Sequence, residues 1–203
     1  MIKQGHSITA TSRSDYTDLC THLGISFFSN DVILLCTSIL SLSQVIKSVP
    51  FHCLKQPTLF VDVLSVKEYP RELMLQVLPH DSDVLCTHPM FGPESGKDGW
   101  KELTFMYDKV RIRNEVTCSS FLQIFAAEGC KMMEMTCEEH DKLAARSQFL
   151  THTVGRVLSK MEIEPTPIDT KTFQKLAEVL RNIELALETI KQQLFKRMNE
   201  ELD

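Results

Sequence analysis

Residues 58–88 read TLFVDVLSVKEYPRELMLQVLPHDSDVLCTH and decide the fold. Two apolar runs, 58–62 and 83–87, flank a segment at 67–78 that alternates like an amphipathic helix. A continuous apolar run between polar turns is typical of a strand that is covered on both faces. Pro70 lies in the first turn of the expected helix, where proline is tolerated. The stretch therefore predicts a strand, a helix and a second strand parallel to the first.

The same pattern continues on either side of this unit. Residues 32–36, VILLC, form an earlier apolar run of the same kind, and a helix is expected after it at 41–48. The other expected elements are strands at 7–11, 105–107, 110–112 and 131–135 and helices at 15–23 and 119–128. Strands that alternate with helices predict an α/β fold with a parallel sheet.

The pattern becomes purely helical further along the chain, with helices expected at 138–161 and 171–202. The second of these helices carries an apolar stripe with the steps of four and three that are typical of a coiled coil. The stripe consists of Leu176, Leu180, Ile183, Leu187, Ile190 and Leu194. We therefore expect an α/β domain at 1–136 and a helical region at 137–203.

Composition excludes several classes of function. The formal net charge is -5, so we expect no broad phosphate-binding surface and no nucleic acid as partner. No apolar run approaches the roughly 18 residues that a membrane span needs, so no membrane association is expected. The spacing of the seven glycines excludes both GxGxxG and the P-loop motif from this chain. The seven cysteines include no CxxC pair, which predicts reduced thiols, such as buried Cys36 and Cys86, and no metal site.

Polar side chains follow three of the expected strands. Thr37 and Ser38 come after the first apolar run, Ser65 after the second and His88 after the third. In an open parallel sheet, ligands bind beyond the carboxyl ends of the strands. These positions therefore indicate a binding site, although ordinary polar turns would show the same residue types.

The segment 87–100, THPMFGPESGKDGW, is the most unusual part of the chain. It holds three of the seven glycines, two prolines and the single tryptophan, Trp100. Glycines let the backbone approach a ligand closely, and prolines stiffen a loop. Composition leaves two interpretations open: a ligand-binding loop, or a rigid structural loop that Trp100 anchors.

This segment also carries a resemblance. Together with LFVDVLSVKEYPRELMLQVLP before it and EEHDKLAARSQFLTHTVGRVL after it, it resembles the plant arogenate dehydrogenases of the prephenate/arogenate dehydrogenase family. The resemblance covers most of residues 2–180, and THPMFGP is highly specific to that family. It implies a Rossmann-type domain, a helical dimerisation domain and the oxidative decarboxylation of arogenate to tyrosine, with hydride transfer to NADP+. It implies the chloroplast as location, although residues 1–6 form no transit peptide.

The resemblance assigns roles to three residues near the expected site. His88 is the expected catalytic base, which accepts a hydrogen bond from the ring C4 hydroxyl as hydride leaves that carbon. A neutral imidazole suits this task because it must take a proton and release it. Ser65 is expected to hydrogen-bond His88 and the nicotinamide side. His152 is the expected substrate-side histidine, although a histidine on a long helix also suits plain packing.

The glycine-rich loop is expected to bind substrate. Lys97 and the backbone of Gly96 and Gly99 are placed to meet a dianionic substrate that bears an amine. Arogenate differs from prephenate by this amine, which replaces a keto group. An acidic side chain near the amine would favour arogenate, and Asp98 is the candidate.

Residues 12–14 bear on the choice of cofactor. An enzyme that uses NAD places an acidic residue at the end of the second Rossmann strand, where it binds the ribose hydroxyls. Here the position reads Ser12, Arg13 and Ser14, whose guanidinium and hydroxyls suit the 2′-phosphate of NADP, although a polar turn would look similar. The other residues expected to bind the cofactor are Thr37, Ser38 and Ile39.

The chain departs from the family pattern in its glycine content and in its length. The first strand of the family and its GxGxxG turn have no counterpart in residues 1–203, and the steps at 30–31 and 179–181 are abbreviated. We therefore expect an incomplete Rossmann-like parallel sheet and NADP+ binding that is weak or absent. The alternatives are an inactive chain that pairs through its helical region with a full-length homologue, a dehydrogenase that prefers prephenate, and a related NADP-dependent reductase. A homodimer is the expected assembly of an active chain.

Overall fold

The computed structural model describes residue 5 and residues 31–54, 57–160, 166–175 and 177. The chain divides into two units, 1–141 and 142–203. The strand expected at 7–11, the helix expected at 15–23 and all six residues of the apolar stripe lie outside the described residues. None of the described helices is both long enough and apolar enough to cross a membrane.

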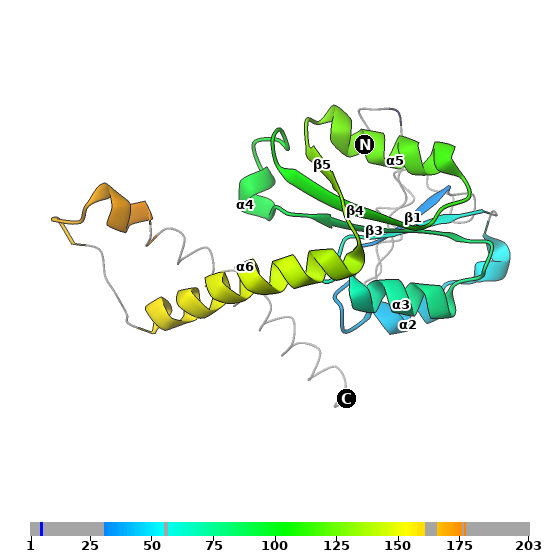
Figure 1. The fold of residues 1–203 in the computed structure, drawn as a ribbon, viewed down its shortest axis with the longest axis horizontal. Coiled ribbons are helices and arrows are strands. Elements are labelled where there is room, and N and C mark those ends of the chain that lie inside the picture. The colour runs from blue at the N-terminus through cyan, green and yellow to red at the C-terminus, as the bar shows by residue number, and fades with distance from the viewer. Residues whose placement is uncertain (1–4, 6–30, 55–56, 161–165, 176, 178–203) are drawn as a thin grey trace, which may run out of the picture. The chain divides into compact units, whose positions relative to one another are not determined.

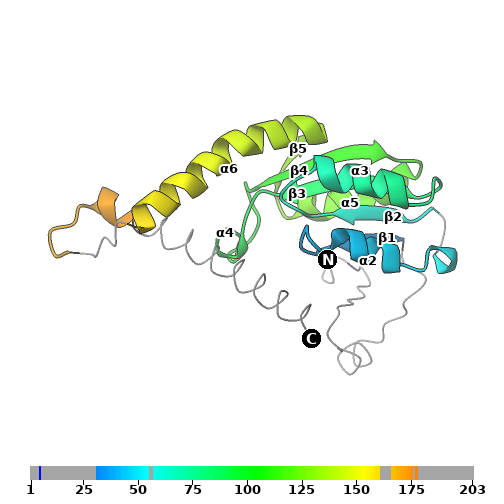
Figure 2. The ribbon, with the colours of Figure 1, turned by 90° about the horizontal axis from the view of Figure 1, so that it is seen from below.

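The first unit is built on a sheet whose strands lie in the order β1-β2-β3-β4-β5 (Figures 1 and 2). The strands are β1 (Val32–Leu35), β2 (Leu59–Asp62), β3 (Asp83–Pro89), β4 (Thr104–Arg111) and β5 (Lys131–Glu134). β1, β2 and β3 pair in parallel, which confirms the predicted α/β architecture. β4 runs antiparallel to β3, and β5 runs parallel to β4.

The antiparallel strand β4 is the main difference from the predicted sheet. The two strand pieces expected at 105–107 and 110–112 form one continuous strand. The connection from β3 holds only the short helix α4 (Pro93–Gly96), whereas a parallel neighbour needs a long crossover, usually a helix that covers the sheet. The chain therefore turns back on itself and enters β4 in the opposite direction.

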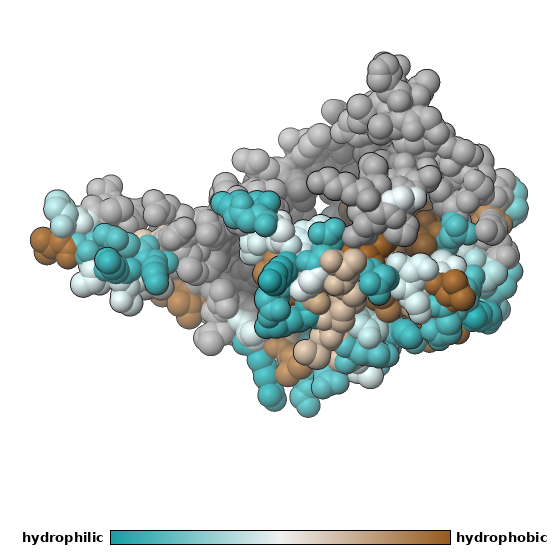
Figure 3. Space-filling model, turned by 90° about the horizontal axis from the view of Figure 1, so that it is seen from above, coloured by the Kyte–Doolittle hydropathy of each residue, from teal (hydrophilic) through white to brown (hydrophobic). Residues whose placement is uncertain are grey.

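Helices cover both faces of the sheet (Figures 1 and 2). The two helices on one face are α2 (Leu42–Ser48) and α3 (Glu68–Val77), and α5 (Glu115–Ala127) lies on the other. The short 3-10 helix η2 (Phe51–Cys53) follows α2. Successive side chains of β2 point to opposite faces of the sheet. Phe60 packs in the core beneath α2 and α3, whereas Leu59 and Val61 pack in the core beneath α5. On the face that Figure 3 shows, polar and apolar residues are interspersed.

The described cysteines are free thiols, as expected. Cys86, Cys118, Cys130 and Cys137 are buried, but Cys36 is exposed, so the prediction of burial is wrong for Cys36. The reason is the end of β1, whose last paired residue is Leu35, so that Cys36 already belongs to the loop beyond the sheet.

A buried carboxylate fixes the start of α5. The Asp83 side chain, 1% exposed, accepts hydrogen bonds from the backbone N–H groups of Arg113 at 2.9 Å and Asn114 at 2.8 Å. Asn114 in turn caps the helix by accepting from the N–H of Thr117 at 3.1 Å. This cap starts α5 before the predicted residue 119.

Asp83→Ala is expected to lower the free energy of unfolding by about 1–3 kcal/mol, because it strips two backbone donors of their acceptor. Urea denaturation measures the difference. The matched control is the exposed neighbour Asp81, whose change to alanine is expected to stay within about 0.5 kcal/mol. Equal losses in both variants would show that Asp83 does not anchor α5.

Candidate functional site

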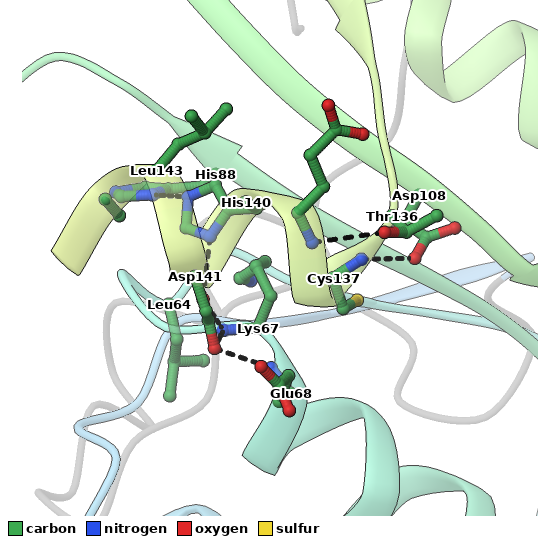
Figure 4. A network of polar contacts seen from close by, with 12 residues as sticks. Leu64, Lys67, Glu68, His88, Asp108, Thr136, Cys137, His140, Asp141 and Leu143 are labelled. Carbon is green, nitrogen blue, oxygen red and sulfur yellow. Dashed lines mark hydrogen bonds and ion pairs between the residues drawn. The ribbon is translucent and has the colours of Figure 1, made fainter. Parts of the chain in front are cut away.

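His88 lies near the carboxyl end of β3, where the sequence predicted a functional side chain. It is 8% exposed, and its Nδ1 atom lies 2.9 Å from Nε2 of His140 (Figure 4). The two rings meet edge to face, with their centroids 5.0 Å apart. His140 comes from the first turns of α6 (Cys137–Ser159) and is 3% exposed. A strand end and a helix start thus bring two buried imidazoles together.

Asp141 continues this chain of contacts. Its Oδ1 atom lies 2.7 Å from Nδ1 of His140 and accepts the backbone N–H of Lys67 at 2.8 Å. Its Oδ2 atom accepts the N–H of Glu68 at 2.9 Å (Figure 4). These two donors are the free N–H groups at the start of α3, a position that favours a negative charge. Asp141 therefore caps α3 from a different element and holds His140 at the same time.

The surroundings keep His88 neutral. Burial is the largest cause that lowers the pKa of His88 from its usual 6.5 to about 4; the neighbouring His140 and the charge of Lys67 act in the same direction, and Asp141 acts in the opposite one. A protonated imidazole would lose hydration at this buried position. His88 can therefore accept a proton at neutral pH.

The unfolding free energy is expected to fall as the pH drops from 6.5 to about 4. In this window the unfolded chain binds a proton at His88 and the folded chain does not, so stability is full above 6.5 and is lost on acidification. The loss amounts to about 3 kcal/mol. Urea denaturation of the wild type and of His88→Asn at several pH values isolates this contribution. A difference between the two that does not change with pH would contradict the lowered pKa.

A buried ion pair holds the backbone of Thr87, the residue before His88. Lys67 and Asp62 are both 0% exposed, and the Lys67 ammonium donates to Asp62 Oδ1 and, at 2.5 Å, to the carbonyl oxygen of Thr87. The Thr87 hydroxyl donates to the Asp62 carbonyl at 2.5 Å. Burial raises the pKa of Asp62, and the charge of Lys67 opposes this rise. The pair joins the end of β2 to the residue that precedes His88.

The other strand-end residues gather at the same edge of the sheet, because β1, β2 and β3 are parallel. Thr37 follows β1, and its hydroxyl is buried without a hydrogen-bond partner among the described residues. Ser38 Oγ lies 3.2 Å from Ser41 Oγ, and Ile39 is partly exposed. Ser65 follows β2, is exposed and makes no hydrogen bond with His88 in the part of the chain that the structure describes. Its role stays a prediction.

The loop after β3 combines a packed end with an exposed end. Trp100 stacks on Phe125 of α5, with ring centroids 5.4 Å apart, so it anchors the loop as one interpretation predicted. A Cβ at Gly96 would lie 3.2 Å from the Phe91 ring, which explains the small residue there. Gly99 has a φ of 118°, which favours glycine, and the neighbouring residues Lys97 and Asp98 are exposed. The binding role of these residues stays a prediction.

Two predicted positions cannot be placed against His88. His152 lies in α6 within the second unit, and its side chain is outside the described ones. Residues 12–14 are outside the described residues.

The structure places two residues beside His88 that the sequence pattern did not indicate. His140 and Asp141 lie far from His88 in the sequence. They are adjacent to each other in EEHD, and this adjacency is the one feature of the sequence that could have indicated them. An acidic residue next to a histidine, just inside a helix that follows a strand, is the pattern that could have indicated them.

A nicotinamide cofactor fits one side of this site. The unpartnered Thr37 hydroxyl at the end of β1 offers a polar group for such a ligand, and the neighbouring Ser38 offers another. The described residues contain no glycine-rich turn that would cradle a pyrophosphate.

Comparisons with known proteins point in one direction. Residues 6–111 match the family model for the nucleotide-binding domain of prephenate dehydrogenase. The chain is 59% identical over 195 residues to arogenate dehydrogenase 1, chloroplastic, from Arabidopsis thaliana, and 45% identical over 239 residues to arogenate dehydrogenase 2, chloroplastic, of the same plant. These alignments cover 90% and 99% of this chain, which spans 30% and 67% of the respective relatives.

Solved structures show the same fold at low identity. Prephenate dehydrogenase from Aquifex aeolicus superposes with a TM-score of 0.55 at 16% identity, over 85% of this chain and 73% of that one. Arogenate dehydrogenase from Synechocystis gives a TM-score of 0.51 at 18% identity, over 83% and 70%. Because the family model covers more than half of the chain, the chain belongs to the prephenate dehydrogenase family, as a member similar to plant arogenate dehydrogenases.

Proposed function

We propose that this chain is an NADP-dependent arogenate dehydrogenase, which oxidatively decarboxylates arogenate to tyrosine. The observation that carries the proposal is the buried, neutral His88 at the edge where three parallel strands end. Its Nε2 atom has no hydrogen-bond partner among the described residues. Membership of the family supplies the reaction class.

His88 acts as the base in this reaction. Its Nε2 atom takes the proton of the ring hydroxyl while the carbon that bears this hydroxyl is oxidised. When bound, NADP+ supplies the acceptor for the hydride that leaves that carbon. The ring carboxylate then departs as carbon dioxide and the ring becomes aromatic. Because the pKa of His88 is lowered to about 4, the residue is ready to take the proton at pH 7 and gives it up to water afterwards.

Substrate recognition is assigned to the loop after β3 and to α6. Lys97 and the backbone of Gly96 and Gly99 would meet the carboxylates of arogenate, and His152 its ring side. Asp98 would attract the amine that distinguishes arogenate from prephenate. Its side chain is exposed, so a ligand can reach it.

The preference for NADP over NAD is assigned to Ser12, Arg13 and Ser14, whose donors suit a 2′-phosphate. Thr37, Ser38 and Ile39 would contact the other end of the cofactor. Ser65 would orient the nicotinamide toward His88.

The chain is further proposed to act in the chloroplast, as the names of its Arabidopsis relatives state for those proteins. Its proposed assembly is a homodimer, or a pair with a full-length homologue, formed through the apolar stripe between Leu176 and Leu194.

Thermal melts with added ligand test the cofactor and the substrate. A ligand that binds the folded chain alone raises its stability by about 2.7 kcal/mol at a hundredfold excess over the dissociation constant. We expect the melting temperature to rise with millimolar NADP+, to rise less with NAD+, and to rise more with arogenate than with prephenate. A transition that no nicotinamide cofactor moves would refute the proposal and favour the inactive chain that pairs with a homologue.

A further inference from the structure

Asp141, His140 and His88 are linked by two successive hydrogen bonds, and these bonds decide which nitrogen of each imidazole ring carries the proton. The Asp141 carboxylate accepts two backbone N–H groups from the start of α3, so it acts as an acceptor. Nδ1 of His140, 2.7 Å from Asp141 Oδ1, must therefore donate. A neutral His140 then has its lone pair on Nε2, which faces Nδ1 of His88 at 2.9 Å. Nδ1 of His88 must donate in turn, and its lone pair is left on Nε2.

Burial makes this arrangement rigid. His140 is 3% exposed and His88 is 8% exposed, so water cannot readily replace either partner. The position of α6 is held from a second side by Asp108 of β4, whose Oδ2 accepts the N–H of Cys137 at 2.8 Å (Figure 4). The proton on a histidine ring is placed by the hydrogen bond that the other ring nitrogen makes. In the absence of the acceptor on His140, His88 would be free to carry its proton on Nε2.

We propose that His140 and Asp141 are positioning residues that hold His88 in the tautomer with the proton on Nδ1, so that Nε2 is available as the base. The catalytic use of this tautomer rests on the proposed function, because a base must present a lone pair to the substrate hydroxyl. The charged or titratable groups that act on the His88 ring are His140 and Asp141 from α6 and Lys67 from the connection before α3. Among the described residues, His140 is the one of these that hydrogen-bonds the His88 ring, and Asp141 acts on the tautomer through His140.

The ring nitrogen shifts of His88 report the tautomer without any need for turnover. Nitrogen-15 labelling of the histidines, with the His88 signals assigned by their loss in His88→Asn, distinguishes the protonated ring nitrogen from the bare one. At pH 7 the wild type is expected to carry the proton on Nδ1 of His88. His140→Leu removes the acceptor and is expected to move the proton to Nε2. His140→Gln is the matched control, because its amide oxygen keeps an acceptor toward His88 and should preserve the wild-type tautomer.

The outcomes separate this inference from the proposed function. A wild-type His88 with its proton on Nε2 would overturn the inference, whatever the activity of the chain. The same tautomer in the wild type and in a folded His140→Leu would also overturn it. A proton on Nδ1 that depends on the acceptor at residue 140, in a chain that shows no turnover, would leave the inference standing and refute the proposed function. Should His140→Leu fail to fold, the wild type and His140→Gln still decide.

Discussion

Lys67→Met is expected to lower the free energy of unfolding by about 3–5 kcal/mol. The substitution keeps an unbranched side chain that is one atom shorter and removes the ammonium that neutralises Asp62. Both groups are 0% exposed, and burial already raises the pKa of Asp62 in the presence of Lys67. Without its partner the carboxylate must either stay buried as an uncompensated charge or take up a proton. Chemical denaturation of the wild type and of Lys67→Met at pH 7 measures the loss. Both unfolding curves are fitted with the same dependence of the unfolding free energy on denaturant concentration.

Two controls show whether the loss comes from the buried charge. Adding Asp62→Asn to Lys67→Met removes the orphaned charge and keeps an acceptor for the N–H of Leu64, so it is expected to restore part of the stability. Lys109→Met breaks an exposed pair with Glu115 and is expected to cost less than about 1 kcal/mol. A loss for Lys67→Met no greater than that for Lys109→Met would contradict the assigned role of the buried pair.

His88→Asn is expected to reduce turnover of arogenate by about 10²–10⁴-fold, the range found when a general base is removed. The amide of asparagine can still donate to Nε2 of His140, so the fold and the chain of hydrogen bonds should be kept. It cannot accept a proton from the substrate. The loss is therefore expected in kcat, with little change in KM, and initial rates of NADPH formation measure both.

The matched control is His80→Asn, at an exposed histidine in the turn before β3. It is expected to leave both kinetic constants unchanged. Turnover by a folded His88→Asn within a factor of about 3 of the wild type would show that another group takes the proton.

The sequence predicted the strands and helices of the first unit better than their directions. Apolar runs located β1, β2 and β3, because a strand that is covered on both faces has apolar residues at nearly every position. The same runs carry no information on direction, so the reversal at β4 was not predicted. That reversal follows from the connection after β3, whose four-residue helix α4 is too short to cover the sheet.

The candidate site was predicted only in part, for a related reason. His88 could be identified because strand ends are local features of the sequence. His140 reaches it from 52 residues away, and their contact depends on where α6 starts against Asp108 of β4. Lys67 was expected at the start of an amphipathic helix, yet it is fully buried, because Asp62 and the Thr87 carbonyl satisfy its charge. Burial of a lysine depends on partners that a local pattern does not reveal.

The rate of arogenate-dependent NADPH formation by the 203-residue chain, followed as NADP+ is raised until the rate saturates, tests the account most directly. We expect a rate that is proportional to the concentration of the chain, saturates with NADP+ and falls by about 10²–10⁴-fold in His88→Asn. A chain that unfolds in a cooperative transition, and is therefore folded, but forms no NADPH with arogenate at any cofactor concentration would contradict it.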